Sequence, residues 1–109
     1  MKWDKLIELG KELPAVVVST SYGTAALKVG KKLMVRLKED GASVVFITDG
    51  TDEQQALIDA KPEVYFITDH YRGYGAVLAR LAKLAVGEAR VRLERAWELQ
   101  ATPKIKKLG

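Results

Sequence analysis

The chain has 109 residues, enough for one folded core, and we expect residues 1–109 to form a single domain. Hydrophobic residues make up 48% and charged residues 29%, a balance typical of globular proteins and not of disordered segments. The chain has no cysteine, which excludes disulfides, thiolate metal sites and cysteine nucleophiles. Its formal net charge of +4 is too small to demonstrate a nucleic-acid partner.

Apolar runs in this chain are short. Lys, Arg, Asp or Glu interrupts every run before it reaches the length of a membrane span. The first four residues lead directly into a polar helical pattern and lack the apolar core of a signal peptide. We therefore expect a cytoplasmic protein without a membrane partner.

Helical spacing marks the start of the chain. Apolar residues recur on one face through Leu13, and Pro14 is expected to end this helix. Residues 15–18 are rich in β-branched side chains and predict a strand. This strand runs into Ser19-Thr20-Ser21-Tyr22-Gly23-Thr24, which we call the hydroxyl segment.

A β-hairpin follows, with strands over residues 26–29 and 33–38 around a short glycine turn. Its second strand alternates in character, which predicts one buried face that carries Leu33, Val35 and Leu37. After a second turn, residues 43–47 predict another strand.

A short helix and a further strand come next. Thr51 and Gln54 fit a capping box, so the helix is expected from about Asp52 to Ala60. Residues 64–67 are again strand-like.

The stretch 76–101 supports two interpretations. Its content of Ala, Leu, Arg and Lys favours one long helix. Residues 77–81 also fit a buried strand, with a break at 86–87 before a final helix. In that helix one face carries Ala89, Leu93, Ala96 and Trp97, and the task expected of Trp97 is core packing. The tail, residues 102–107, is expected to be frayed and basic.

One segment concentrates chemistry-bearing side chains. Thr68-Asp69-His70-Tyr71-Arg72-Gly73-Tyr74-Gly75, here called the tyrosine loop, contains the only histidine of the chain and two of its four tyrosines. An ordinary loop would carry scattered polar residues, so this segment indicates a functional site. Every hypothesis about that site depends on whether the tyrosine loop meets the hydroxyl segment in space.

Several short motifs together resemble a known family. They are Leu13-Pro14, Ser21-Tyr22-Gly23-Thr24, Lys28-Val29, Arg36-Leu37-Lys38-Glu39-Asp40, Phe66-Ile67-Thr68-Asp69, His70-Tyr71-Arg72-Gly73-Tyr74 and Ala96-Trp97. In this order they resemble the MmcQ/YjbR-like proteins, small bacterial domains often labelled DNA-binding. The tyrosine-loop motif is the most specific. Relatives commonly have a proline at the positions of Ala25 and Gly75, so this chain departs from the pattern at both loops.

The resemblance implies a fold and a role. The implied fold is a two-layer α+β architecture, an antiparallel sheet with helices packed on one face, akin to type III secretion chaperones and frataxin-like proteins. It also implies that Ala76 to Ala82 is a strand, and we expect the strand there against helix propensity. The implied role is DNA binding without enzymatic activity.

Under the DNA-binding hypothesis, basic side chains would meet phosphates and tyrosines would stack on bases or support those contacts. The residues expected to do so are Lys31, Lys32, Arg36, Arg72, Tyr71 and Tyr74. Lysines at a hairpin tip are also common in soluble proteins, and nearby acidic residues would oppose phosphate binding.

Two binding alternatives remain. If the hydroxyl segment and the tyrosine loop meet, they would form a polar cleft suited to a phosphate or carboxylate, with Ser21, Tyr22, Thr24 and His70 in it. The plainer interpretation is that Tyr22 and Tyr74 pack over the sheet edge and that their hydroxyls hold the loops in place. Alternatively, residues 26–29 would form an edge strand that pairs with a protein partner.

Catalytic and metal chemistry find less support. Ser19 or Ser21 would need His70 within about 2.6–3.2 Å to act as a nucleophile, and neither lies in a nucleophile-elbow pattern. One histidine and no cysteine do not supply the convergent ligands of a transition-metal site. We therefore expect a protein that is not an enzyme and has no cofactor or metal.

Overall fold

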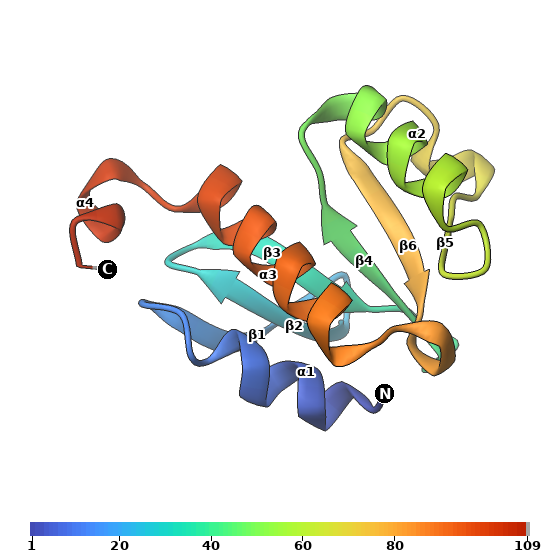
Figure 1. The fold of residues 1–109 in the computed structure, drawn as a ribbon. Helices are drawn as coiled ribbons and strands as arrows, with labels where there is room; N and C mark the ends of the chain where they lie inside the picture. Colours follow the sequence, from blue (N-terminus) through green and yellow to red (C-terminus); the bar gives the residue numbers. More distant parts are fainter. Residues whose placement is uncertain (109) are drawn as a thin grey trace.

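Six strands form one antiparallel sheet in the computed structural model, which describes residues 1–108 (Figure 1). The strand order is β1-β2-β3-β4-β6-β5, and each pair of neighbours is antiparallel. The strands are β1 (Val16–Ser21), β2 (Thr24–Val29), β3 (Lys32–Leu37), β4 (Ser43–Ile47), β5 (Tyr65–Phe66) and β6 (Ala76–Arg80).

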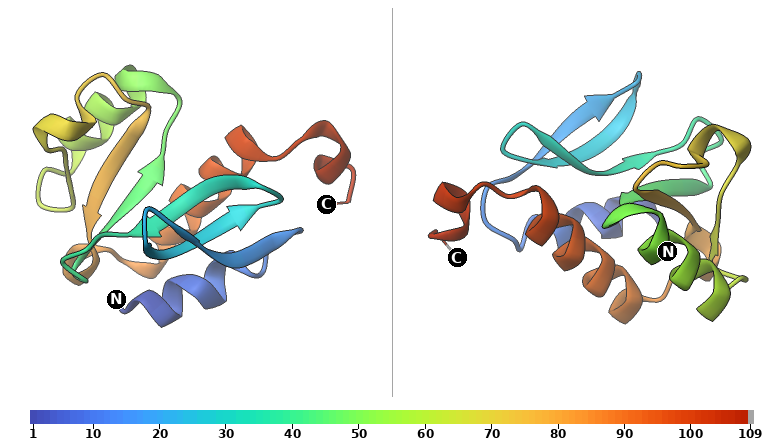
Figure 2. Two further views of the ribbon diagram at one scale, coloured as in Figure 1. Left: turned by 180° about the vertical axis from the view of Figure 1, so that it is seen from behind. Right: turned by 90° about the horizontal axis from the view of Figure 1, so that it is seen from above.

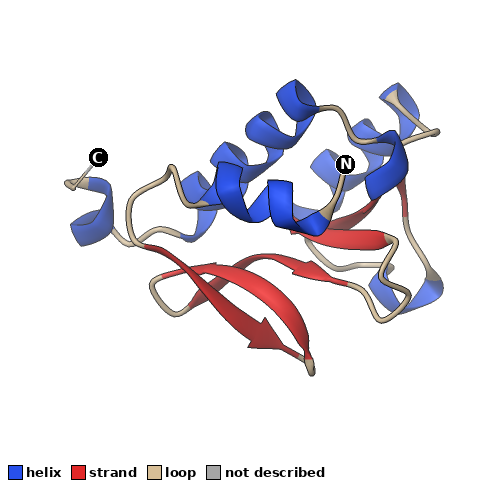
Figure 3. Cartoon of the chain, turned by 90° about the horizontal axis from the view of Figure 1, so that it is seen from below, coloured by secondary structure: helices blue, strands red, loops and turns tan. Residues whose placement is uncertain are grey.

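The longer helices cover one face of this sheet. They are α1 (Trp3–Gly10), α2 (Gly50–Ala60) and α3 (Val86–Gln100), and the short α4 (Pro103–Lys106) ends the described chain. Figure 3 shows the strands below the main helices, with a single turn of helix, η1 (Asp69–Tyr71), on the other side of the sheet. The chain is therefore α+β, with an antiparallel sheet and helices on one face, as expected. In the described chain no helix is both long and apolar enough to cross a membrane.

The ambiguous stretch divides into a strand and a helix. β6 lies between β4 and β5, and four of its five residues are buried. An interior strand covered on both faces can be apolar along its whole length, which explains why its composition resembled that of a buried helix. In α3 the buried residues are the predicted ones, Ala89, Leu93, Ala96 and Trp97. The Trp97 ring packs in the core, and its Nε1 donates a hydrogen bond to the Pro14 carbonyl at 2.8 Å.

A β-bulge in β3 overturns the predicted alternation. Leu27 pairs with Val35 while Lys28 pairs with Leu33, so Met34 is the extra residue on β3. Met34 and Val35 both join the core beneath the helices, whereas Leu33 faces the opposite side. A bulge inserts one residue into the period-2 pattern and therefore shifts the residues before it to the other face.

Three element boundaries also differ from the predictions. The first helix ends at Gly10 and not at Pro14. A Cβ at Gly10 would lie 2.5 Å from Leu27 Cδ1, so the helix end packs closely against β2. The second helix begins at Gly50, and Gln54 is buried instead of capping it. The tail is not frayed: it forms α4, which Thr102 caps by accepting a hydrogen bond from the Ile105 amide.

The edge strand also differs from the one expected. β1 lies at the edge of the sheet, and β2, which contains residues 26–29, is paired on both sides. An exposed pairing edge is therefore offered by β1 and not by residues 26–29. Figure 2 shows the β1–β2 hairpin extending away from the half of the sheet that holds β4 and β6.

Ion pairs and a buried tyrosine connect α3 to α2, to Lys61 at the end of α2 and to β5. Arg95 Nε donates to Glu53 at 2.9 Å, and Lys61 Nζ lies 3.0 Å from Glu88. The Tyr65 hydroxyl donates to Glu88, and burial together with that carboxylate raises the pKa of Tyr65. Burial would raise the pKa of Glu88, but its hydrogen bonds from Tyr65 and Lys61 outweigh this effect and lower it. These contacts hold α2 against α3 on the helix-covered side.

Candidate ligand pocket

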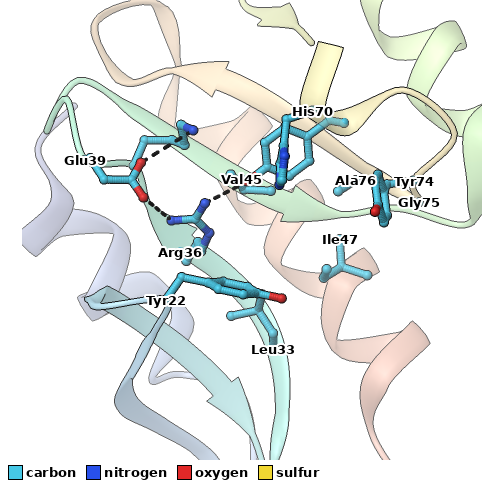
Figure 4. Close-up of a pocket in the computed structure, with 12 residues that line it drawn as sticks. Tyr22, Leu33, Arg36, Glu39, Val45, Ile47, His70, Tyr74, Gly75 and Ala76 are labelled. Carbon is cyan, nitrogen blue, oxygen red and sulfur yellow. Dashed lines mark hydrogen bonds and ion pairs between the residues drawn. The ribbon is translucent and has the colours of Figure 1, made fainter. Parts of the chain in front are cut away.

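The face of the sheet opposite the helices, which we call the open face, is only partly covered. The tyrosine loop crosses it and buries a small apolar cluster of Val45, Tyr71, Ala76 and Leu78. Beside this cluster the sheet is hollowed into a pocket of about 600 Å³ (Figure 4). Its lining residues are Tyr22, Leu33, Arg36, Lys38, Glu39, Val45, Ile47, His70, Tyr71, Tyr74, Gly75 and Ala76.

The pocket has an apolar floor and a charged end. Val45, Ile47 and Ala76 come from the adjacent strands β4 and β6 and form the floor together with Leu33. Arg36, Lys38 and Glu39 lie at the charged end, where β3 leads into the next turn. Tyr22 enters from one side and His70 and Tyr74 from the other (Figure 4). A concave site with apolar walls and a few convergent polar groups is the usual form of a small-molecule site.

Arg36 joins the two polar segments. Its Nη1 donates to Thr24 Oγ1 of the hydroxyl segment at 3.1 Å, and its Nη2 donates to the Tyr71 hydroxyl of the tyrosine loop at 2.7 Å. The Arg36 guanidinium carbon also lies 5.3 Å from the centre of the Tyr22 ring. Arg36 is only 5% exposed, so its charge is held in place by these partners. The hydroxyl segment and the tyrosine loop therefore do meet, through a residue that belongs to neither.

Glu39 lies between two cations. Its carboxylate is 3.3 Å from Arg36 Nη1 and 3.5 Å from Lys38 Nζ. A hydrogen bond from its own backbone, and the charges of Lys38 and Arg36, lower the pKa of Glu39 despite some loss of solvation. Glu39 is therefore ionised at neutral pH. Lys38 Nζ also lies 5.5 Å from the centre of the Tyr71 ring.

A glutamine from α2 holds the tyrosine loop in position. Gln54 Nε2 lies within hydrogen-bond distance of the carbonyls of Tyr71, Tyr74 and Ala76, at 3.1, 3.0 and 2.7 Å. Gln54 is 4% exposed, so these contacts are shielded from water. Within the loop the His70 ring stacks on Tyr74 with centroids 6.2 Å apart and meets Tyr71 edge-on at 5.1 Å. This arrangement fixes the aromatic wall of the pocket.

The turn that carries Tyr22 is strained. Tyr22 and Gly23 connect β1 to β2 and have φ values of 53° and 79°. A two-residue turn with both φ values positive favours Asn-Gly, because a bulky side chain is disfavoured in the left-handed region. The Tyr22 side chain is nevertheless 85% exposed and lines the pocket mouth. Packing into the core does not explain this residue.

The predicted nucleic-acid residues do not form one surface. Lys31 and Lys32 are exposed at the β2–β3 turn. Arg36 and Tyr71 are 5% and 8% exposed and hydrogen bond to each other, so burial leaves them little surface for contact with a duplex. Arg72 is exposed but pairs with Asp69 at 2.9 Å, while Tyr74 is 60% exposed.

Two of the four predicted pocket residues line the pocket, and the other two do not. Tyr22 and His70 line the pocket. Thr24 supports it indirectly, because its hydroxyl accepts from Arg36 and donates to the Ser21 carbonyl at 3.0 Å. Ser21 contributes this backbone carbonyl and not its hydroxyl.

Sequence reasoning did not place Lys38, Glu39 and Gln54 at the pocket. Lys38 and Glu39 belong to the matched motif after Arg36, but the motif does not say which side of the sheet they face. Gln54 was assigned to a helix cap because the three-residue spacing from Thr51 fits that pattern. Its contacts to carbonyls 17 to 22 residues away leave no local signal in the sequence.

Within the described residues, His70 is not paired with either serine that was considered as a nucleophile. In residues 1–108, His70 makes no hydrogen bond to Ser19 or Ser21. Its imidazole packs against the Tyr71 and Tyr74 rings. Residues 1–108 also contain no group of three or more His, Asp or Glu side chains that could hold a metal ion.

Comparison with known proteins gives limited information. No family model matches the chain. Uncharacterized proteins from Mycobacterium bovis and from two strains of Mycobacterium tuberculosis are 44% identical to it over 50 residues. That match covers 46% of this chain and 39% of each relative, so the chain spans well under half of these proteins.

Proposed function

We propose that this protein is a small-molecule binding module whose site is the pocket on the open face. The observation that carries the proposal is the convergence on Arg36 of two segments that are far apart in sequence. A volume of about 600 Å³ is in the usual range for ligand sites, roughly 300–1,000 Å³. A buried guanidinium is costly unless its partners satisfy it, and this network keeps one at the charged end of the pocket.

The proposed activity is binding without chemistry on the ligand. The Thr24 hydroxyl is already hydrogen-bonded to Arg36, and His70 packs against the rings of Tyr71 and Tyr74. This arrangement supports recognition and lacks a nucleophile paired with a base. We place the protein in the cytoplasm as part of the same proposal.

A fragment screen followed by protein NMR tests the binding role. Neutral, cationic and anionic fragments are titrated into ¹⁵N-labelled protein, and amide shifts are mapped on the structure. We expect shifts to cluster at residues 36–39 and 70–76. Fragments that perturb only the helix-covered side, or none that bind, would contradict the proposal.

A plug variant and a matched control sharpen this screen. Leu33→Trp places an indole in the pocket from its floor and should abolish the fragment shifts. Val91→Trp adds the same ring at a site on α3 that is 50% exposed and should leave them unchanged. Circular dichroism and thermal unfolding of both variants confirm that they are folded.

DNA binding is a second candidate, favoured by a basic end of the molecule. Lys31 and Lys32 are exposed at the β2–β3 turn, and Ile105 of α4 lies against this turn, 3.0 Å from where a Cβ on Gly30 would stand. This contact brings the neighbouring exposed lysines Lys104 and Lys107 to the same end. Lysines from two segments would contact phosphates without reading sequence.

Salt dependence tests this candidate. Labelled duplex DNA is titrated at low and moderate salt against the wild type and a Lys31→Ala/Lys32→Ala variant. Four phosphate contacts, at about −0.9 each, would give a slope of about −3.6 in log affinity against log salt concentration. Removing two of the lysines should reduce the magnitude of this slope to about half. If no binding occurs at low salt, where charge attraction is strongest, this candidate is wrong.

A further inference from the structure

The charged end of the pocket has an excess of positive charge. Two cations, Arg36 and Lys38, share the single carboxylate of Glu39, which leaves a net charge of +1 among the three side chains. Two other acidic residues lie nearby, and neither lines the pocket: Asp69 pairs with Arg72, and Asp40 accepts from the amides of Ala42 and Ser43 while its charge also acts on Lys38. This end of the pocket therefore favours an anion.

Glu39 is held loosely, whereas Arg36 is held firmly. The Glu39 side chain is 60% exposed and that of Arg36 is 6% exposed. An exposed ion pair adds little stability, so moving the Glu39 carboxylate into water costs little. Arg36 would keep its hydrogen bonds to Thr24 and Tyr71 when Glu39 leaves. Glu39 thus occupies a carboxylate position that another carboxylate can take.

The rest of the pocket suits a flat ring system. Tyr22 and Tyr74 are exposed aromatic residues on different sides of the hollow, above an apolar floor of Val45 and Ile47 (Figure 4). Tyrosine faces pack well on planar rings. Tyr22 is also kept in a strained backbone conformation where Asn would be favoured, and such strain persists mainly where function requires the side chain.

We propose that the ligand is a planar aromatic monocarboxylate, whose rings lie between Tyr22 and Tyr74 and whose carboxylate displaces Glu39 from Arg36 and Lys38. This inference rests on the proposed binding role and names the chemistry of its ligand. The volume of about 600 Å³ accommodates two or more fused rings.

A matched pair of probes tests the chemistry. 2-Naphthoate carries the carboxylate, and 2-naphthamide has nearly the same shape without the charge. Dissociation constants come from NMR titrations of residues that line the pocket. We expect 2-naphthoate to bind about tenfold more tightly than the amide, because a charge-assisted hydrogen bond to Arg36 is stronger than a neutral one.

Two charge variants test the displacement of Glu39. Glu39→Gln removes the competing carboxylate and should tighten 2-naphthoate binding about threefold or more. Lys38→Gln removes one of the two cations and should weaken 2-naphthoate binding by about the same factor. Neither change should affect 2-naphthamide. Glu8→Gln is the control for Glu39→Gln, because it removes an exposed carboxylate of an (i, i+3) ion pair on α1.

The outcomes separate this inference from the binding role. Equal affinities for acid and amide at the pocket, or weaker 2-naphthoate binding in Glu39→Gln, would overturn the ligand assignment and leave the pocket as a site for another ligand. If neither probe shifts pocket residues and the broader fragment set also binds elsewhere, both the assignment and the proposed binding role are wrong.

Discussion

The two faces of this sheet differ in what covers them. The helix-covered face is sealed by α1, α2 and α3 over large apolar side chains such as Phe46, Leu93 and Trp97. The open face has apolar residues from the same strands, but a loop covers only part of it, and a buried arginine connects that loop to a turn. Apolar packing therefore specifies one face and a polar network specifies the other. A surface that apolar packing leaves open is available for a ligand.

The largest expected effect contrasts the two faces directly. Leu93→Ala empties a fully buried position beneath the helices and should lower the free energy of unfolding by about 2–5 kcal/mol. Leu33→Ala truncates a partly exposed side chain on the pocket floor and should cost less, about 1 kcal/mol. Urea unfolding of both variants measures the difference. Equal losses would mean that the open face is packed like a core.

The next effect concerns the glutamine beneath the tyrosine loop. Gln54→Leu leaves the carbonyls of Tyr71, Tyr74 and Ala76 without their donor and should cost about 1–3 kcal/mol. It should also shift the NMR signals of His70 and Tyr74. Gln55→Leu, one residue further along α2, removes only an exposed hydrogen bond to Asp59 and serves as the control. If both variants lose the same free energy of unfolding, the effect belongs to α2 itself and not to the contacts of Gln54.

A smaller effect on stability is expected from a substitution that should stabilise the fold and weaken ligand binding. Tyr22→Asn relieves the strain of a left-handed tyrosine and should raise the free energy of unfolding by about 1 kcal/mol. The same variant should bind 2-naphthoate more weakly, because one aromatic wall is lost. Tyr22→Phe keeps the ring and should change neither property much. If Tyr22→Asn is less stable than the wild type, Tyr22 has a structural role that the exposed side chain does not show.

The smallest effect is a pH dependence at the edge of the pocket. Hydrogen bonds from Ala42 and Ser43 lower the pKa of Asp40, against an opposing effect of burial. A lowered pKa stabilises the folded state above the unfolded pKa of about 3.9, and this contribution disappears as pH falls through the folded value. Because Asp40 is exposed, we expect Asp40→Ala to cost less than about 1 kcal/mol at pH 7 and nothing near pH 2. A cost that persists in acid would mean that charge is not its source.

The sequence predicted most elements because their signals are local. Both strands of the β2–β3 hairpin, the strand over residues 43–47 and the buried face of α3 follow from periodicity and turn residues. The strand at residues 76–80 needed the family resemblance, because an interior strand and a buried helix have similar composition. The bulge at Met34 places Leu33 on the opposite face of the sheet from the one predicted, and a single inserted residue leaves no local pattern in the sequence.

The site was predictable only in part, for a physical reason. The tyrosine loop and the hydroxyl segment stand out by composition, but their meeting depends on Arg36, whose partners lie 12 and 35 residues away. As a basic residue in a hairpin, Arg36 resembled a phosphate ligand. Burial changed its role, since a guanidinium with 5% exposure serves as an anchor for two segments.

A crystal structure with 2-naphthoate tests the central claim most directly. We predict rings between Tyr22 and Tyr74, a carboxylate beside Arg36 and Lys38, and a Glu39 side chain turned into solvent. A 2-naphthoate molecule bound on the helix-covered side, or bound in the pocket with Glu39 still between Arg36 and Lys38, would contradict the account.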